Sequence, residues 1–399
     1  MRFVIIGNGV AGVTAAKALA EGGSGAEVEV YTREAYHYYP RPRLQELLAG
    51  QMEIDDVYFR QPAWYEERGI AVHLGTEVRE IDTAGKRIIL VGGESVDYDR
   101  LLLATGGHPF IPPIKGVDKQ GVYALRTLED AKAIRERAMG AERAVVVGGG
   151  LLGLEAARAL RALGIGVTVL EMAPFLLPRQ LDAEGGGLLR ELIGAMGIDV
   201  VVGAATQAVV GEEWATGVEM KDGERIDGDL IIISAGIRSS VDLARSAGLE
   251  VKRGVVVDEH LQTSAEDIYA AGDVAEFEGR VYGIIPAALE QARAAALNML
   301  GEKTDYKGTI FSNTLNVVGI DCASIGTVHP EGEGYEELRS IRAGVYKKLV
   351  LEDGHLVGAI LLGDTKDVAP ISRLIRQKAD VSAYIEDLLN EGFDWRALS

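Results

Sequence analysis

A chain of 399 residues, 47% of them hydrophobic, can build the cores of two or three domains. Its formal net charge of −19 at pH 7 disfavours nucleic acid or an anionic membrane surface as a partner, because both are polyanions. The single cysteine, Cys322, excludes an internal disulfide, a zinc cluster and a cysteine-ligated iron–sulfur centre within one chain.

The amino terminus is expected to enter a strand at once. A β-branched run begins at residue 2, which leaves no room for a signal peptide. No apolar stretch approaches the roughly 18–20 residues of a membrane span. The sequence therefore predicts a soluble protein of the cytoplasm.

Two similar units follow one another along the chain. Residues 2–19 read RFVIIGNGVAGVTAAKAL and residues 143–160 read RAVVVGGGLLGLEAARAL. Each is a strand-like run, a G-x-G-x-x-G turn and an alanine-rich helical pattern, and a further strand follows at 28–32 and at 167–171. One such motif is weak evidence in a chain with 50 glycines, but two in matched context predict two bound dinucleotides.

Each glycine of the motif has its own physical reason. The first allows the tight turn out of the strand, the second lets a pyrophosphate approach the backbone, and the third lets helix and strand pack closely. The helix that follows offers free N–H groups and a partial positive charge to the phosphates. The six glycines are Gly7, Gly9 and Gly12 in the first unit and Gly148, Gly150 and Gly153 in the second.

An acidic residue at the end of the second strand usually binds the adenosine ribose. In the second unit this residue is Glu171, and no basic residue follows closely, which favours NADH over NADPH. Arg179 keeps the NADPH alternative open. In the first unit the same position holds Thr32, so the ribose contact comes either from Glu34 or from Thr32 and Arg33.

Two later motifs identify the family. Residues 101–107 read LLLATGG and residues 268–274 read IYAAGDV. With these motifs the sequence resembles the pyridine nucleotide–disulfide oxidoreductase superfamily of flavoproteins over nearly its whole length. The resemblance implies that the first nucleotide is FAD and the second NADH. It implies that Thr105 and Gly106 lie beside the flavin nucleotide. It also implies that Asp273 forms a hydrogen bond with the ribityl chain of FAD.

The resemblance also implies the domain organisation. The expected fold class is α/β, with two Rossmann-like dinucleotide-binding domains and a C-terminal α+β interface domain. The FAD domain would comprise residues 1–110 and 237–310, the NAD domain would be inserted at 111–236, and the C-terminal domain would comprise 311–399. Prolines near residue 110 and the S-A-G run at 234–236 mark the crossings.

Catalytic positions follow from the same resemblance. Glu155, after the second glycine motif, matches a glutamate near the nicotinamide; otherwise it is a solvated carboxylate in the first turns of a helix. The segment that contains Pro286 and Glu290 matches the helix whose start faces the pyrimidine edge of the flavin, where it would stabilise negative charge. The other expected cofactor-binding positions are Val10, Ala11, Arg41, Pro42, Val78, Ala104, Arg126, Leu151, Leu152, Ala235, Gly236 and Gly272.

The sequence leaves more than one possible electron acceptor. Related disulfide reductases, peroxidases and NADH oxidases have one or two cysteines in the region that matches residues 36–48, and this chain has none there. Electrons are therefore expected to leave the flavin directly. The Y-x-R-P-R-L run at 39–44 resembles NADH:rubredoxin oxidoreductases and the flavin module of NADH nitrite reductases. Arg41 in this run would contact FAD phosphates or be a solvated surface arginine, and Glu46 argues against the oxygenase-coupled ferredoxin reductases.

The sequence is compatible with four functions. The first is NADH-dependent reduction of a small electron carrier such as a rubredoxin. The second is an NADH oxidase that delivers electrons to oxygen. The third is the diaphorase subunit of a nitrite reductase, in which a partner subunit supplies the siroheme. The fourth is a protein whose redox state controls partner binding. No metal site is expected, because the six histidines lack ligand spacing.

The C-terminal segment is expected to contain strands at 314–319, 345–351 and 356–362, a hairpin turn at 352–354 and helical structure over 364–390. Cys322 lies in an alternating strand pattern and is expected to be a buried structural thiol. A homodimer and a monomer both remain open. A local excess of positive charge is either a docking site for an acidic carrier or a solvated basic face. It consists of Lys347, Lys348, Arg373, Arg376 and Lys378.

Overall fold

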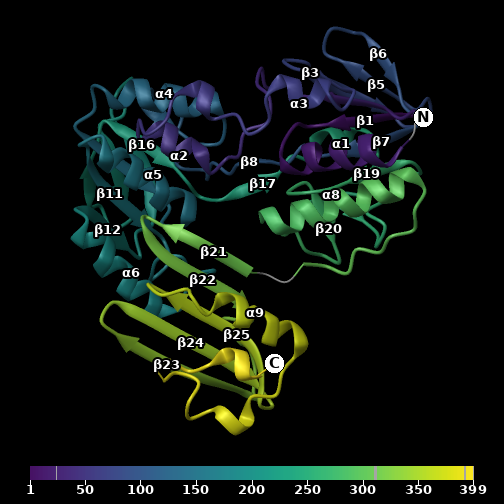
Figure 1. Cartoon of the computed structure of the whole chain (residues 1–399). Helices are drawn as coiled ribbons and strands as arrows, with labels where there is room; N and C mark the ends of the chain where they lie inside the picture. Colours follow the sequence, from purple (N-terminus) through teal and green to yellow (C-terminus); the bar gives the residue numbers. More distant parts are fainter. Residues whose placement is uncertain (24, 310–311, 391, 399) are drawn as a thin grey trace. The chain divides into compact units, whose positions relative to one another are not determined.

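The computed structural model describes residues 1–23, 25–309, 312–390 and 392–398, which form two compact units (Figure 1). Unit 1 contains Met1–Leu47, Met52–Pro109 and Ile237–Thr309. Unit 2 contains Leu48–Gln51, Phe110–Gly236 and the described residues of Ile310–Ser399. The chain thus leaves unit 1, builds part of unit 2, and returns. The predicted domain boundary between residues 310 and 311 lies outside the described residues.

Unit 1 is built on a parallel sheet of five strands in the order β19-β7-β1-β2-β3. The crossover order places β1 at the centre, so that the turn after it opens at the carboxyl edge of the sheet. The strands are β1 (Arg2–Ile6), β2 (Glu27–Tyr31), β3 (Ile70–His73), β7 (Arg100–Leu103) and β19 (Ile268–Ala270). Smaller elements complete the unit: α3 (Pro62–Glu66), α7 (Asp242–Ser246), β4 (Val78–Asp82), β5 (Arg87–Leu90), β6 (Ser95–Asp97), β8 (Gly107–Pro109), β17 (Ile237–Ser239), β18 (Val255–Val257) and β20 (Ala275–Phe277).

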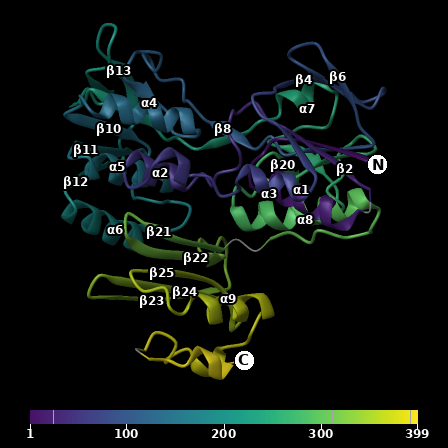
Figure 2. The ribbon, with the colours of Figure 1, turned by 45° about the horizontal axis from the view of Figure 1, so that its top comes forward.

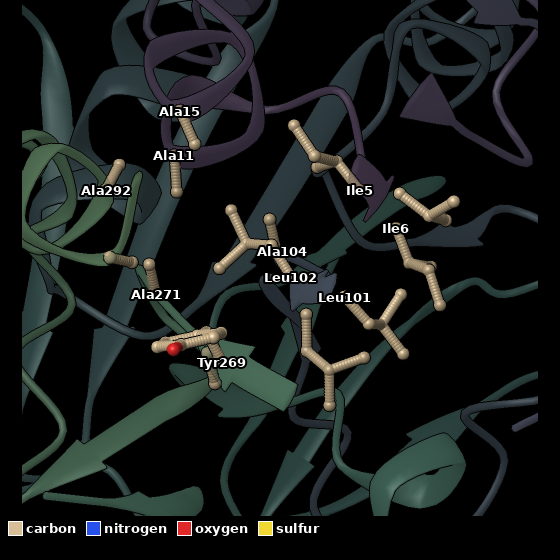
Figure 3. Close-up of a cluster of buried hydrophobic side chains, with 14 of the residues drawn as sticks. Ile5, Ile6, Ala11, Ala15, Leu101, Leu102, Ala104, Tyr269, Ala271 and Ala292 are labelled. Atoms are coloured by element: carbon tan, nitrogen blue, oxygen red, sulfur yellow. The ribbon is translucent and has the colours of Figure 1, made fainter. Parts of the chain in front are cut away.

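Two helices pack closely in the core of unit 1. Helix α1 (Val10–Gly22) and helix α8 (Ile285–Leu300) are in contact through small side chains. Figure 3 shows Ala11 and Ala15 of α1 in one cluster with Ala292 of α8 and Leu102 of the sheet. Alanine lets the helix backbones approach, and the aliphatic side chains of the strands fill the space beneath. The glycine turn before α1 is therefore held between a rigid sheet and a rigid helix pair.

Unit 2 contains a second parallel sheet, of order β12-β11-β10-β16-β9. Its strands are β9 (Val122–Tyr123), β10 (Arg143–Val147), β11 (Gly166–Glu171), β12 (Ile198–Val202) and β16 (Leu230–Ile233). The helices are α4 (Leu128–Ala138), α5 (Leu151–Ala162) and α6 (Ala183–Ala195), and a small antiparallel sheet is formed by β13 (Thr206–Val210), β14 (Gly217–Met220) and β15 (Arg225–Asp227). Helix α2 (Arg43–Leu48) ends at the first residue of unit 2.

The C-terminal part of unit 2 is an antiparallel sheet in the order β21-β22-β25-β24-β23. The strands are β21 (Ser312–Val317), β22 (Ile320–Gly326), β23 (Tyr335–Arg342), β24 (Val345–Glu352) and β25 (His355–Leu362). Figure 2 shows helix α9 (Val368–Gln377) beside this sheet, and its Ile371 and Leu374 are buried in the same apolar cluster as β25. Short 3-10 turns follow at Ser382–Tyr384 and Trp395–Leu398.

The structure confirms the expected α/β class with two Rossmann-like sheets and a C-terminal α+β part. The strands expected at 345–351 and 356–362 are β24 and β25, joined by the expected hairpin turn. The strand expected at 314–319 is wrong at its end, because β21 stops at Val317 and residues 318–319 form a turn. The helix expected over 364–390 is also wrong in length: α9 ends at Gln377, where Lys378 takes a left-handed conformation with φ of 49°. In the described part of the chain, helices are too short or too polar to cross a bilayer.

Candidate functional site

The first glycine turn, after β1, leaves room for a ligand at one position only. Gly7 has φ of +113°, and a Cβ there would lie 2.2 Å from the Ala104 carbonyl oxygen. A Cβ on Gly12 would lie 1.9 Å from the Gly7 oxygen, so these two glycines are required by packing. A Cβ on Gly9 would meet no atom of the described residues within 4 Å, its two chain neighbours aside. The open space at Gly9 suits a phosphate that approaches the backbone closely.

The second glycine turn, after β10, repeats this arrangement. A Cβ on Gly148 would lie 2.2 Å from the Ser234 oxygen, and one on Gly153 would lie 2.0 Å from the Gly148 oxygen. A Cβ on Gly150 would again meet nothing within 4 Å. The two turns therefore have the same steric design, although they belong to different units.

Both turns lead into helices that lack a side-chain cap. Helix α1 begins after Gly9 and α5 begins after Gly150, and neither has an acidic residue in its first turn. The first N–H groups of a helix have no partner within the helix, and the helix dipole favours a negative charge beside them. The predicted positions Val10 and Ala11 open α1, and Leu151 and Leu152 open α5. The residues present thus fit a pyrophosphate at each turn.

Glu171 lies beside the second glycine turn and is 9% exposed. Its Oε2 accepts a hydrogen bond from the Gly149 N–H at 2.7 Å, and its Oε1 accepts one from the Ala173 N–H, also at 2.7 Å. A Cβ on Gly149 would lie only 2.9 Å from the Cβ of Glu171, so packing also requires a glycine at this position. Glu171 therefore fixes the turn as well as marking the strand end, while Arg179 is exposed.

In the first unit, Glu34 and Arg41 form an ion pair, and the Tyr39 hydroxyl donates to the same carboxylate. Burial would raise the pKa of Glu34, but the Arg41 charge and these hydrogen bonds outweigh it and hold the pKa below its ordinary value. Arg41 is thus held in an ion pair, with its side chain 32% exposed. Thr32, at the strand end, is 8% exposed, and Arg33 is exposed. The structure brings together two residues that the sequence presented as separate candidates.

The A-T-G and G-D turns of unit 1 are tied to neighbouring chain segments. The Thr105 hydroxyl donates to the Ser240 carbonyl oxygen at 2.9 Å, and the Ser239 hydroxyl donates to the Asp273 carbonyl oxygen at 2.6 Å. Gly106 and Gly272 have φ of 65° and 85°, respectively, which are left-handed values that glycine adopts readily. These bonds fix the backbone around the predicted Thr105, Gly106 and Asp273 positions.

Gln291 is a positioning residue that the sequence reasoning missed. It lies on α8, is 1% exposed, and its Oε1 accepts the Gly272 N–H at 2.8 Å. Its Nε2 lies 3.5 Å from the Tyr306 hydroxyl, which is 2.7 Å from the Thr309 hydroxyl. The one available signal was a glutamine among buried alanines, because a buried amide requires hydrogen-bond partners. Gln291 connects the G-D turn to helix α8.

The start of α8 carries the two predicted positions of that helix. Pro286 lies in its first turn and is exposed, and no side chain caps the helix. The Glu290 Oε2 accepts a hydrogen bond from the Thr309 hydroxyl at 2.5 Å. Glu290 is therefore linked through Thr309 and Tyr306 to Gln291. The uncapped start leaves N–H groups for a negatively charged partner.

Glu155 lies on α5 with its side chain 13% exposed. Its Oε1 accepts the backbone N–H of Val318 at 2.8 Å, and its Oε2 lies 3.4 Å from Nε of Arg158. The solvated alternative for this carboxylate is therefore wrong. The contact joins the dinucleotide-binding part of unit 2 to a hairpin of the C-terminal sheet.

The remaining predicted positions are spread over both units. The Val78 side chain belongs to the core of unit 1, as does that of Ala104, so a cofactor contact at Val78 would involve its backbone. The Arg126 N–H donates to Asp130 ahead of α4 in unit 2. Three further positions are exposed: Pro42, Ala235 and Gly236.

Two lysines of the predicted basic face are held in ion pairs, whereas Arg376 and Lys378 of the same set are exposed. Lys348 is 2% exposed, and its ammonium lies 2.8 Å from Glu337 and 3.4 Å from Asp182. The Lys347 ammonium is paired with Asp367 at 2.9 Å. The alternation of β24 turns Lys348 inward, where carboxylates neutralise it, so these lysines do not form an open surface for a carrier.

Comparison with known proteins finds matches over most of the chain. A model of the pyridine nucleotide-disulphide oxidoreductase family matches residues 1–295, and one of the rubredoxin NAD+ reductase C-terminal domain matches residues 312–379. A nitrite reductase [NAD(P)H] of Bacillus subtilis is 37% identical, with 96% of this chain and 48% of that protein covered. An NADH-rubredoxin oxidoreductase of Clostridium acetobutylicum is 31% identical, with 91% of each covered.

A solved structure supports the fold in three dimensions. The NAD-dependent persulfide reductase from A. fulgidus superimposes with a TM-score of 0.88 at 30% identity, covering 95% of this chain and 77% of that one. This chain spans half or less of the length of the nitrite and nitrate reductase proteins that it matches.

Proposed function

Because this chain belongs to the pyridine nucleotide-disulphide oxidoreductase family and uses FAD and NADH, we propose that it passes electrons from NADH through FAD to an external carrier of rubredoxin type. When bound, FAD takes two electrons from NADH and can release them one at a time. The resemblance of residues 312–379 to the C-terminal domain of rubredoxin NAD+ reductases supports the choice of carrier.

The observation that carries this proposal is the state of the only thiol. Cys322 is fully buried in β22, and burial raises its pKa to about 12. A disulfide relay needs a thiolate that a substrate can reach. The chain has neither a second cysteine nor a reactive first one, so its residues offer no intermediate carrier between FAD and the acceptor.

The residues of each site would have distinct tasks. In unit 1, the turn at Gly9 and the start of α1 would hold the FAD pyrophosphate, while Arg41 would turn from Glu34 toward the phosphates. Gln291 would hold the Gly272 backbone, so that Asp273 meets the ribityl chain. The uncapped start of α8 would stabilise negative charge at the pyrimidine edge.

In unit 2, the turn at Gly150 and the start of α5 would hold the NADH pyrophosphate. The Glu171 carboxylate would accept hydrogen bonds from the adenosine ribose hydroxyls. It has lone pairs for these bonds besides those that accept the Gly149 and Ala173 N–H groups. Glu155 would lie at the nicotinamide end. A 2′-phosphate would meet the Glu171 carboxylate, which supports NADH over NADPH.

A second candidate is the diaphorase module of an assimilatory nitrite reductase. Four relatives with nitrite or nitrate reductase names match at 34–37% identity, and this chain covers 38–50% of each. In that arrangement the electrons would pass to a redox centre outside the residues of this chain.

Anaerobic stopped-flow separates the two candidates. FAD-loaded protein, NADH and oxidised rubredoxin are mixed, and the visible absorbance of rubredoxin is followed. Bleaching at several turnovers per second supports the carrier proposal. Reduction of the flavin without bleaching contradicts the carrier proposal. A nitrite reductase partner, or oxygen, would then be the leading candidate for the electron acceptor. NADPH in place of NADH serves as the control for the donor side.

Replacement of Cys322 by alanine should leave NADH-to-rubredoxin turnover within about twofold of the original, because the thiol takes no part in electron transfer. Loss of the buried sulfur should lower the free energy of unfolding by roughly 1 kcal/mol. Turnover and urea denaturation check both. A loss of turnover with native stability would show that the thiol is redox-active after all.

Replacement of Gln291 by leucine should weaken FAD retention, because it leaves the buried Gly272 N–H without an acceptor at a cost of about 1–3 kcal/mol. Replacement by glutamate keeps an acceptor and should retain more FAD. The flavin-to-protein absorbance ratio after gel filtration measures both. Equal FAD content in the leucine variant and the original protein would contradict this role.

A further inference from the structure

Glu155 is held by the tip of the hairpin that joins β21 to β22. Its Oε1 accepts the Val318 N–H at 2.8 Å, and both residues lie in unit 2. Strands β21 and β22 pair as far as Val317 and Ile320, so residues 318 and 319 form a two-residue turn. In such a turn the first N–H points away from the ladder and needs another acceptor. Glu155 supplies it.

The backbone at Val318 is unusual for its side chain. Its φ is 52°, in the left-handed region, where β-branched residues are rare and strained. Two other hairpins of this sheet have the same turn, with Ala343 and Asp353 at φ of 45° and 49° before a glycine. Those two residues are exposed, whereas Val318 is 3% exposed.

Packing explains how Val318 keeps this conformation. Its side chain belongs to the apolar cluster that includes Leu154, the neighbour of Glu155 on α5, and Val317 and Cys322 of the hairpin. An aliphatic side chain in this cluster fixes the tip against α5 and directs its N–H at the carboxylate. An Asn-Gly turn would suit the hairpin better but would lose this anchor.

We propose that Val318 is a positioning residue: through its N–H, the C-terminal sheet fixes the orientation of Glu155 and so sets the affinity for the nicotinamide half of NADH. This rests on the proposed function, in which Glu155 lies at the nicotinamide end of the dinucleotide. It gives the C-terminal sheet a part in the use of the electron donor, separate from any contact with the acceptor.

The test compares NAD⁺ with ADP-ribose, which lacks the nicotinamide, on the oxidised, FAD-loaded full chain by calorimetry. In Val318→Gly, which removes the anchor, NAD⁺ should bind roughly tenfold more weakly, and ADP-ribose should bind within about twofold of the original. Ala343→Gly makes a similar change in an exposed turn of the same sheet and should alter neither affinity. Thermal melting checks that each variant is folded, and Val318→Asn, which tolerates a left-handed backbone, replaces Val318→Gly if that variant does not fold.

A double-mutant cycle separates positioning from general loosening. In the Glu155→Ala background, Val318→Gly should cause no further loss of NAD⁺ affinity, because the carboxylate through which Val318 acts is gone. Unchanged NAD⁺ affinity in Val318→Gly overturns the inference, as does an equal loss of ADP-ribose affinity or an undiminished loss without Glu155. Failure of the unaltered protein to bind NAD⁺ would instead overturn the proposed function.

Discussion

Replacement of Gly150 by valine should leave the chain folded and loaded with FAD, while KM for NADH rises on the order of 100-fold, equivalent to about 2.7 kcal/mol. Among the described residues other than its two chain neighbours, none has an atom within 4 Å of a Cβ at this position, and Gly150 has an extended backbone that any residue adopts. The side chain would occupy the space that the NADH pyrophosphate requires. Steady-state kinetics and flavin absorbance measure the two effects.

Gly153, three residues further on in the first turn of α5, provides the matched contrast. A Cβ there would lie 2.0 Å from the Gly148 oxygen, a backbone atom that has no freedom to move aside. Gly153→Ala should therefore fail to fold or melt well below the original protein. If Gly150→Val kept its KM, the pyrophosphate would bind elsewhere, and the proposed NADH site would be wrong.

Replacement of Lys348 by methionine should destabilise unit 2 by about 2 kcal/mol, because the buried ammonium and its hydrogen bonds are lost. The Lys348 ammonium donates to the Val328 carbonyl oxygen at 3.1 Å and neutralises Glu337 and Asp182. Its loss would leave Arg339 as the remaining counter-charge of these two half-buried carboxylates. Urea denaturation at neutral pH measures the change.

Lys347→Met is the control, one residue away on the same strand. The Lys347 side chain is 22% exposed, against 3% for Lys348, and has one ion pair, with Asp367, so its loss should cost less, about 1 kcal/mol. Equal effects of the two substitutions would show that the Lys348 cluster contributes no more than a surface ion pair.

Asp182 makes this cluster sensitive to acid. Burial would raise its pKa, but hydrogen bonds from the Tyr346 hydroxyl and the Gly185 N–H, together with the Lys348 charge, hold it below its ordinary value. A carboxyl whose pKa is lowered by folding contributes stability above its unfolded pKa, near 3.9, and loses it as pH falls through the folded value. Tyr346→Phe should therefore flatten the loss of stability below about pH 4.

The local features of the cofactor turns could be predicted from the sequence. The roles of Gly7 and Gly12 follow from a strand–turn–helix pattern, and the structure shows the same close contacts at Gly148 and Gly153. The burial of Cys322 also followed from strand alternation. These properties depend on residues close together in sequence, so a period of two or a fixed spacing is enough to predict them.

Properties that depend on distant residues could not be predicted. Gln291 receives its hydrogen bond from a residue 19 positions earlier, and Lys348 meets Asp182 from another part of the chain. Neither pairing has a local signal. The end of α9 was misjudged for a different reason: Lys378 adopts the left-handed conformation that usually marks a glycine, so the sequence lacked the usual stop signal.

The two hydrogen bonds that Glu171 accepts would make the proposed coenzyme preference hard to alter by a single substitution. An arginine at this position is the obvious change toward NADPH. It would leave the Gly149 and Ala173 N–H groups without their acceptors, so the glycine turn would no longer be held in place. A chain under selection for the other coenzyme would first need a new way to hold that turn. In this scaffold, the proposed choice of electron donor and the rigidity of the binding turn would depend on the same residue.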